Sequence, residues 1–253
     1  MRVMVVLPTY NEAQSIEEVL RRTRAAVPDA SILVVDDGSP DGTADLADKA
    51  ALELGGIEVM RRAAPNGLGD AYRAGFALGL AEGAEVLVEM DSDLSHDPGA
   101  LPALLGAVAD HDLVIGSRYV PGGSIPHWGL HRRLLSRGGN IYSSVLLGVP
   151  VKDMTSGFRA YRSSLLETMD LDSIRADGYG FQIEMTYRAA QRQARITEVP
   201  IRFVDRELGV SKMSSRIVVE ALELVTVWGI KRLLHRIRGQ RSAGRSAEVG
   251  AHR

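Results

Sequence analysis

Short apolar runs rich in β-branched residues alternate with helix-patterned segments, and this alternation constrains the fold more than any other feature. The strand-like runs cover 3–7, 32–36, 57–60, 86–90 and 113–115, and the helical segments cover about 14–27, 42–54, 69–81 and 98–110. Such alternation is typical of an α/β fold in which helices flank a mostly parallel sheet. Ligands of these sheets bind at the carboxyl ends of the strands, so we expect the polar residues that follow each run to converge on one site.

The composition excludes several classes of protein. There is no cysteine among the 253 residues, which excludes disulfides, thiolate metal sites and cysteine nucleophiles. The formal charge of −2 gives no whole-molecule attraction to nucleic acid, and we expect no nucleic-acid partner. The first apolar run is too short for a secretory signal, and no stretch approaches the roughly 18 to 20 apolar residues that span a bilayer. These features favour a cytoplasmic chain without a transmembrane helix.

The second half of the chain is organised less regularly. After a Gly- and Pro-containing loop we expect a helix at about 132–147, a strand at 157–161, a helix at 180–193 and a strand at 196–203. We divide the chain into a globular domain at 1–213, an amphipathic helix at 214–238 and a disordered basic tail at 239–253. The amphipathic helix either packs on the protein's own core or, through its basic second half, meets a membrane surface or a membrane-embedded partner.

Two carboxylates, Asp91 and Asp93, follow directly on the predicted strand at 86–90. Residues at i and i+2 of an extended chain share a face, so both side chains can reach one hard cation through oxygen ligands. A Mg²⁺ or Mn²⁺ ion held there would also bridge a diphosphate. Aspartates are common in surface turns as well, and it is the position after a buried strand that favours the metal site.

Polar residues also follow the first two strands. Tyr10 and Glu12 offer a ring that can stack on a base and a carboxylate that can accept from its edge. Asp36 and Asp37 end the second run, where a carboxylate can accept from a base or a ribose. Asp-Gly-Ser is also good turn chemistry, and Asp is a good helix cap. We predict that the three strand ends bind one nucleotide.

Several cations follow the fifth strand and the loop after it. Arg118 stands at the strand end, and Arg132, Ser136 and their neighbours Arg133 and Arg137 lie on the next predicted helix. Forked guanidinium groups beside a hydroxyl suit a phosphate. For Arg133 and Arg137 a solvated helix face is favoured instead. We expect a structural role for the histidine at 96, and the tryptophan at 128 is a candidate for contact with lipid.

Taken together, the motifs resemble glycosyltransferase family 2, and within it the dolichol-phosphate or polyprenol-phosphate mannosyltransferases. The resemblance runs from Pro8 to about Lys212. Its motifs are Pro8 to Glu12, Val35 to Thr43, Asn66 to Gly69, Asp91 to His96, Gly116 to Tyr119, Ser136 to Gly139, Asp153 to Arg159, Glu198 to Ile201 and Arg206 to Lys212. The ordered set is far more specific than any one of its members.

The resemblance implies a GT-A nucleotide-diphospho-sugar transferase fold and a role for each matching residue. The residues that would hold the donor GDP-mannose are Pro8, Tyr10, Glu12, Val35, Asp37, Asp91, Ser92, Asp93, Arg118, Arg206 and Lys212. The acceptor phosphate would lie on Arg118, Arg132 and Ser136, which together with Asp93 form the implied catalytic set. The metal would lie on Asp91 and Asp93. Where the family often has Gln this chain has Ser95, so contact of Ser95 with the metal is either direct or through water.

The activity implied by the resemblance is inverting, Mg²⁺- or Mn²⁺-dependent transfer of mannose from GDP-mannose to a polyprenyl phosphate, at the cytoplasmic face of a membrane. Asp177, Gln182 and Glu184 are candidates for contact with sugar hydroxyls or for roles at a helix start. Glucose transfer from UDP-glucose is the nearest alternative. A nucleotidyltransferase is a more distant one, because the Gly- and Lys/Arg-rich triphosphate loop that it needs after the first strand is missing from 8–12.

Overall fold

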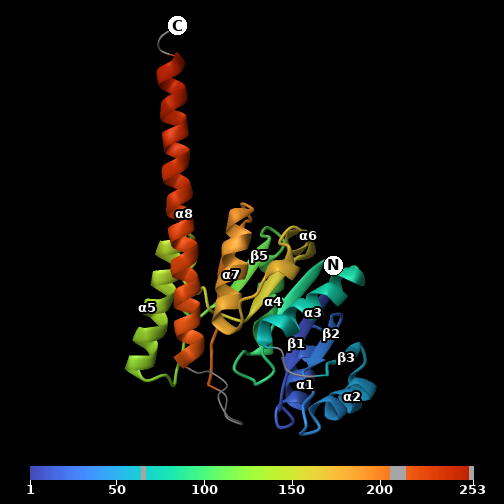
Figure 1. Cartoon of the computed structure of the whole chain (residues 1–253). Coiled ribbons are helices and arrows are strands. Elements are labelled where there is room, and N and C mark those ends of the chain that lie inside the picture. Colours follow the sequence, from blue (N-terminus) through green and yellow to red (C-terminus); the bar gives the residue numbers. More distant parts are fainter. Residues whose placement is uncertain (64–66, 206–214, 251–253) are drawn as a thin grey trace.

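The structure is a computed structural model that describes residues 1–63, 67–205 and 215–250 (Figure 1). Two residues expected to bind the donor, Arg206 and Lys212, lie outside the described residues. Within the described part, seven strands form one sheet in the order β3-β2-β1-β4-β6-β5-β7. The strands are β1 (Val3–Thr9), β2 (Ser31–Asp36), β3 (Ile57–Arg61), β4 (Val86–Glu89), β5 (Leu113–Ser117), β6 (Arg159–Arg162) and β7 (Ile196–Pro200).

The sheet is parallel except at β6, which pairs antiparallel with both β4 and β5. The α/β fold with a mostly parallel sheet is therefore confirmed. Because β1, β2, β4 and β5 run in the same direction, their carboxyl ends lie on one edge of the sheet, and the predicted site residues follow these ends. The last strand is shorter than predicted, and Phe203 beyond it makes an isolated antiparallel bridge to His96.

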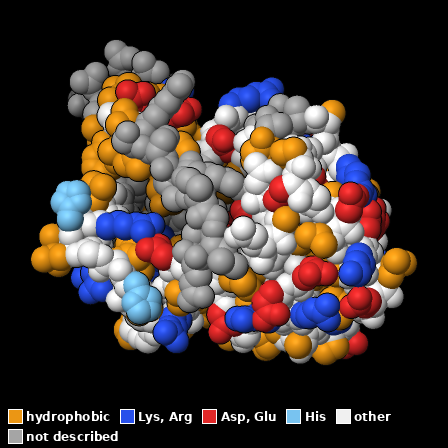
Figure 2. Space-filling view, turned by 90° about the horizontal axis from the view of Figure 1, so that it is seen from below, with side chains coloured by type: hydrophobic (Ala, Val, Ile, Leu, Met, Phe, Trp, Pro, Cys, Tyr) orange, Lys and Arg blue, Asp and Glu red, His pale blue; other side chains and the backbone are white. Residues whose placement is uncertain are grey.

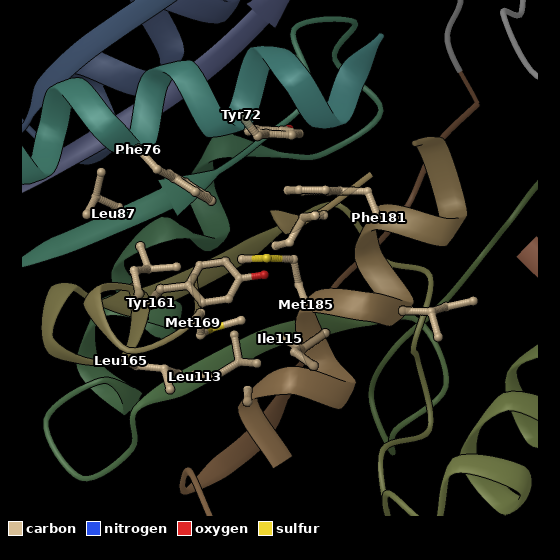
Figure 3. Packing of buried hydrophobic residues seen from close by; sticks show 14 of the residues in the cluster. Tyr72, Phe76, Leu87, Leu113, Ile115, Tyr161, Leu165, Met169, Phe181 and Met185 are labelled. Atoms are coloured by element: carbon tan, nitrogen blue, oxygen red, sulfur yellow. The ribbon is translucent and has the colours of Figure 1, made fainter. Parts of the chain in front are cut away.

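Helices cover both faces of the sheet. They are α1 (Ile16–Ala26), α2 (Thr43–Leu54), α3 (Leu68–Ala81), α4 (Leu101–Ala107), α5 (Leu130–Leu147), α6 (Ser163–Glu167), α7 (Gly178–Gln191) and α8 (Ser215–Gly250), with short 3₁₀ turns η1 (Pro98–Ala100) and η2 (Leu171–Ser173). One core lies between the sheet and α1, α2 and α4, and the other lies under α3 and α7. In the second core the rings of Tyr72 and Phe181 stack with their centroids 6.0 Å apart, which joins α3 to α7 (Figure 3).

Helices α5 and α8 lie side by side at one edge of the molecule (Figure 1). Ala221 and Val225 of α8 are buried, so its first half packs on the protein's own core. The helix continues to Gly250 instead of ending near 238, so the segment expected to be disordered is helical up to that residue. The segment has no proline, and Ala, Arg, Gln and Glu are good helix formers. None of the helices in the described residues is both long and apolar enough to cross a membrane.

Candidate active site

The turn after β4 carries the two predicted metal ligands. Ser92 is buried, and its hydroxyl donates to the carbonyl oxygen of Pro8 at 2.7 Å, which ties the ends of β4 and β1 together. Asp93 accepts from the backbone N–H of Ser95 at 3.0 Å, and the buried Tyr72 hydroxyl donates to Asp91 Oδ1 at 3.4 Å. The turn is thus held from both sides, with the two carboxylates at the carboxyl end of a central strand.

The oxygen atoms of this turn fit a hard divalent cation. No group of three His, Asp or Glu side chains suited to a metal occurs in the residues that the structure describes, so Asp91 and Asp93 would need water and a substrate diphosphate to complete the shell. Ser95 lies beside them: its hydroxyl is buried and has no hydrogen-bond partner among the described residues. An unpartnered buried hydroxyl is costly, and an ion or a bound water would satisfy it.

His96 follows the turn that carries Asp91 and Asp93, and its ring lies between two other aromatic rings. Its ring centroid is 5.2 Å from that of Phe158 and 5.3 Å from that of Phe203. Nδ1 lies 3.5 Å from Asp91 Oδ2. Burial lowers the pKa of His96 to about 4, with the nearby Arg118 acting in the same direction and Asp93 opposing it. The imidazole is therefore neutral at physiological pH, and its surroundings agree with the structural role that we expected.

The buried His96 predicts an acid-dependent loss of stability. Between about pH 6.5 and about pH 4 the unfolded chain binds a proton that the folded chain does not, so the free energy of unfolding falls as the pH is lowered through this window. At pH 5 we expect the loss relative to pH 7.5 to be about 2 kcal/mol larger for the wild type than for His96→Phe. Urea unfolding at the two pH values measures it, and an equal loss in both proteins would contradict a neutral buried imidazole.

The nucleoside end of the site is built by β1 and β2. Asp36 is not aimed at a ligand: it accepts from Thr9 Oγ1 at 2.9 Å and from the backbone N–H and hydroxyl of Ser39, so it organises the turn. Asp37, by contrast, lies beside Arg62, whose Nε is 3.1 Å from Asp37 Oδ1. Arg62 follows β3, and sequence reasoning missed it because a single arginine after a strand carries no pattern. Asp37 and Arg62 thus place a carboxylate and a guanidinium at the edge of the sheet where β2 and β3 end.

At the nucleoside end of the site, Pro8 and Val35 offer backbone groups instead of polar side chains. Val35 is fully buried in β2 and pairs with Pro8 across the parallel strands. Glu12 is buried, its backbone N–H donates to Thr43 Oγ1 at 2.9 Å, and its carboxylate accepts from the Ser15 hydroxyl at 3.3 Å. Tyr10 lies half-buried on the same turn. The predicted nucleoside residues are therefore brought together at one edge of the sheet.

Arg118 is held by a buried ion pair. Its Nε and Nη2 donate to the two carboxylate oxygens of Asp153 at 2.8 and 2.6 Å, and both side chains are almost fully buried. Burial alone would raise the pKa of Asp153, and the Arg118 guanidinium more than offsets this, so the pKa is lowered. The sequence indicates Asp153 only as part of a motif and gives it no role, because its partner Arg118 follows β5, 35 residues earlier in the chain.

Arg132 and Ser136 approach the same place from α5. The guanidinium carbons of Arg132 and Arg118 lie 4.0 and 5.7 Å from the ring centroid of Trp128, so the two predicted phosphate-binding arginines flank one indole. Arg132 also pairs with Asp205 at 2.8 Å. The Ser136 hydroxyl accepts from the Tyr119 hydroxyl at 2.7 Å, which leaves its own proton for a further acceptor.

Trp128, a candidate for contact with lipid, is buried in the structure. It is 7% exposed, and its indole N–H donates to Asp205 at 2.8 Å, so in this structure it is a buried part of the arginine site rather than a lipid contact. Glu184 is likewise a structural residue, because its carboxylate accepts from Arg188 one turn along α7 at 2.8 Å. Asp177 accepts from the backbone N–H of Gly69 at 2.8 Å, and Gln182 is buried beneath the site.

The chain has close relatives among known proteins. It is 53% identical over 230 residues to the undecaprenyl-phosphate mannosyltransferase of Micrococcus luteus, with 91% of this chain and 95% of the relative covered. It is 51% identical over 240 residues to the polyprenol monophosphomannose synthase of Mycolicibacterium smegmatis, with 94% and 91% covered. A solved mannosyltransferase of Pyrobaculum calidifontis, in complex with GDP-mannose and Mn²⁺, has a TM-score of 0.58 at 16% identity and covers 98% of this chain and 80% of its own.

The solved structure is too distant in sequence to support more than the fold, and that fold is the GT-A fold expected from the motifs. A family model described as Glycosyl transferase family 2 matches residues 4–170. This match covers more than half of the chain and includes the turns after β1, β2, β4 and β5 that build the site. The chain therefore belongs to glycosyl transferase family 2.

Proposed function

We propose that this protein transfers mannose from GDP-mannose to the phosphate of a polyprenyl phosphate, with inversion at the anomeric carbon. The observation that carries the proposal is the identity above 50%, over more than nine-tenths of the chain, to two bacterial proteins whose names state mannose transfer to prenyl phosphates. The site agrees with this reaction, because a carboxylate pair for the donor side and an arginine pair for the acceptor side lie at one edge of the sheet.

On the donor side, the strand ends of β1 and β2 would receive the nucleoside, and Asp91 and Asp93 would hold Mg²⁺ or Mn²⁺. A solved mannosyltransferase of the same fold contains GDP-mannose and Mn²⁺, so this fold can accommodate that donor and that ion. When bound, the ion supplies Lewis-acid neutralisation of the charge that develops on the departing diphosphate. The protein contributes by positioning the diphosphate leaving group.

On the acceptor side, the nucleophile needs no strong base. A phosphate monoester has its second pKa near 6, so at neutral pH its oxygen is already largely ionised. Arg118, Arg132 and Ser136 hold this phosphate with charge-assisted hydrogen bonds. Catalysis then consists of aligning one phosphate oxygen with the anomeric carbon and stabilising the leaving group. In-line attack on the α-linked donor gives a β-linked mannosyl phosphate.

The helices at the edge of the molecule suit a lipid-bound acceptor. Exposed large apolar side chains on α5 and α8 are Leu130, Leu134, Leu135, Ile141, Val145, Val219, Val227, Ile230, Leu233 and Leu234. Figure 2 shows hydrophobic side chains gathered at the side where Figure 1 places these helices. An exposed apolar face of this extent beside basic residues is typical of helices that lie in a membrane interface. We propose peripheral attachment through α5 and α8, directly or through a membrane-embedded partner.

Transfer of radiolabelled sugar into organic-extractable lipid tests the proposal. The purified protein, a polyprenyl phosphate and Mn²⁺ or Mg²⁺ are mixed with GDP-mannose or, in parallel, with UDP-glucose. We expect labelling from GDP-mannose that stops when the metal is chelated with EDTA. Labelling from UDP-glucose alone would replace the proposal with glucose transfer, and labelling from neither donor would contradict it.

A further inference from the structure

The segment 153–159, Asp-Met-Thr-Ser-Gly-Phe-Arg, belongs to the family motifs, but its residues are not among those expected to contact the donor, the metal or the acceptor. It lies in the connection between α5 and β6, ends on the first residue of β6, and contacts Arg118. Asp153 at its start holds Arg118 with a buried two-oxygen ion pair, and the Arg118 backbone N–H also donates to Asp153 at 2.9 Å. The direction of the Arg118 side chain is thus fixed by hydrogen bonds to this segment.

Thr155 is the junction between Arg118 and helix α5. Its hydroxyl accepts from Arg118 Nη2 at 2.8 Å and from the side-chain amide of Asn140 at 3.3 Å. In return, the Thr155 backbone N–H donates to Asn140 Oδ1 at 3.2 Å. One threonine therefore bonds both to the guanidinium at the end of β5 and to the inner face of α5.

The same helix carries the other two residues of the acceptor site. Asn140 lies one turn after Ser136 and donates to the Ser136 carbonyl oxygen at 2.9 Å. Arg132 lies one turn before Ser136. Thr155 and Asn140 therefore fix the position of the inner face of α5 relative to Arg118. The outer face of α5 exposes the apolar side chains of Leu135 and Ile141.

The base of this junction is itself anchored to the sheet. Glu198 of β7 accepts from the backbone N–H groups of Lys152 and Asp153, each at 2.9 Å. The bonds at Glu198, Asp153 and Arg118 involve ionised groups, which form the stronger kind of hydrogen bond. The last step to α5 is a pair of neutral hydrogen bonds between Thr155 and Asn140. A shift of α5 relative to Arg118 would have to break these bonds.

We propose that Thr155 is a positioning residue for the acceptor phosphate: it holds Arg118 in register with Arg132 and Ser136 of α5, so that three groups from two elements meet one phosphate. The inference rests on the proposed function, because it takes the acceptor to be a prenyl monophosphate. It predicts that loss of the Thr155 hydroxyl weakens binding of the acceptor and leaves binding of the donor nucleotide unchanged.

The test uses the full chain and two probes measured by calorimetry, farnesyl phosphate for the acceptor and GDP with Mn²⁺ for the donor. Thr155→Val keeps the shape and removes the hydroxyl, and a hydrogen bond to a charged group is strong enough that we expect affinity for farnesyl phosphate to fall about tenfold. GDP affinity should stay within about twofold of wild type. Thr155→Ser, which restores the hydroxyl, should recover the acceptor affinity. Thr168→Val is the matched control, because its hydroxyl bonds to the Leu165 carbonyl oxygen away from the site.

Each outcome decides the inference. Unchanged affinity of Thr155→Val for farnesyl phosphate, or an equal loss for both probes, would overturn it, as would a wild type that does not bind farnesyl phosphate. If Thr155→Val does not fold, Asn140→Ser removes the amide on the other side of the junction and should give the same acceptor-specific loss. Failure of the proposed function shows differently, as absence of mannose transfer by the wild type.

Discussion

Asp93→Ala should lower the rate of mannose transfer by roughly 10³-fold, the scale on which removal of one group that stabilises transition-state charge is felt. Asp93 is partly exposed at the strand end, and its carboxylate accepts from the Ser95 backbone N–H within the same turn at 3.0 Å. Because the side chain is not part of the buried core, we expect its removal to leave the protein folded. Initial rates with saturating GDP-mannose and Mn²⁺, together with a thermal melt, measure both sides of the prediction.

Asp97→Ala is the control for this variant. Asp97 lies four residues further along the same loop and caps a short helical turn by accepting from the Gly99 backbone N–H at 2.9 Å. It carries the same charge, so loss of charge from the loop is matched between the variants. Transfer by Asp97→Ala should stay close to that of the wild type. If Asp93→Ala retained activity within about tenfold of the wild type, far above the expected loss, the metal role of Asp93 would be refuted.

Asp153→Ala should lower the free energy of unfolding by about 3 to 5 kcal/mol, the cost of breaking a buried ion pair by removing one partner. The Arg118 guanidinium would remain almost fully buried with its main counterion gone. The Trp128 and Phe203 rings, whose centroids lie 5.7 and 5.3 Å from the guanidinium carbon, cannot replace the carboxylate as a counterion. Equilibrium urea unfolding of the wild type and the variant at pH 7.5 measures the difference.

A surface ion pair provides the comparison for Asp153→Ala. Glu53 pairs with Arg21 at 3.3 Å, and the two side chains are 49% and 50% exposed. Exposed pairs of this kind contribute about 0 to 1 kcal/mol, so Glu53→Ala should be nearly neutral. A loss for Asp153→Ala no larger than that for Glu53→Ala would mean that the ion pair of Arg118 and Asp153 is not the buried pair that the structure shows.

Local patterns in the sequence predict the parts of this molecule that local chemistry determines. The strand ends are predictable because buried parallel strands are continuous apolar runs, and the residues after them must lie at one edge. This reasoning predicts that Asp91 and Asp93 lie at the carboxyl end of β4, and the structure places them there. The antiparallel β6 is not predictable in the same way, because its direction depends on which neighbours it meets in the completed sheet.

The interactions that sequence reasoning missed join residues far apart in the chain. Arg62 meets Asp37 and Asp153 meets Arg118 only once the strands are assembled. Trp128 is only a candidate for lipid contact in the sequence, because a tryptophan in a polar loop gives no sign of the Asp205 that accepts its N–H. The extent of α8 was underestimated because its Gly and Ser residues were weighed as disorder signals against good helix formers.

The most direct test of the account is the structure of the product formed from GDP-mannose, a polyprenyl phosphate and Mn²⁺ by the purified protein. Mass spectrometry gives the composition of the lipid, and NMR gives the anomeric configuration of its sugar. The account predicts one hexose joined to the lipid through a single phosphate, identified as mannose in the β configuration. An α-linked mannose would contradict in-line displacement, and a lipid without mannose would contradict the proposed function itself.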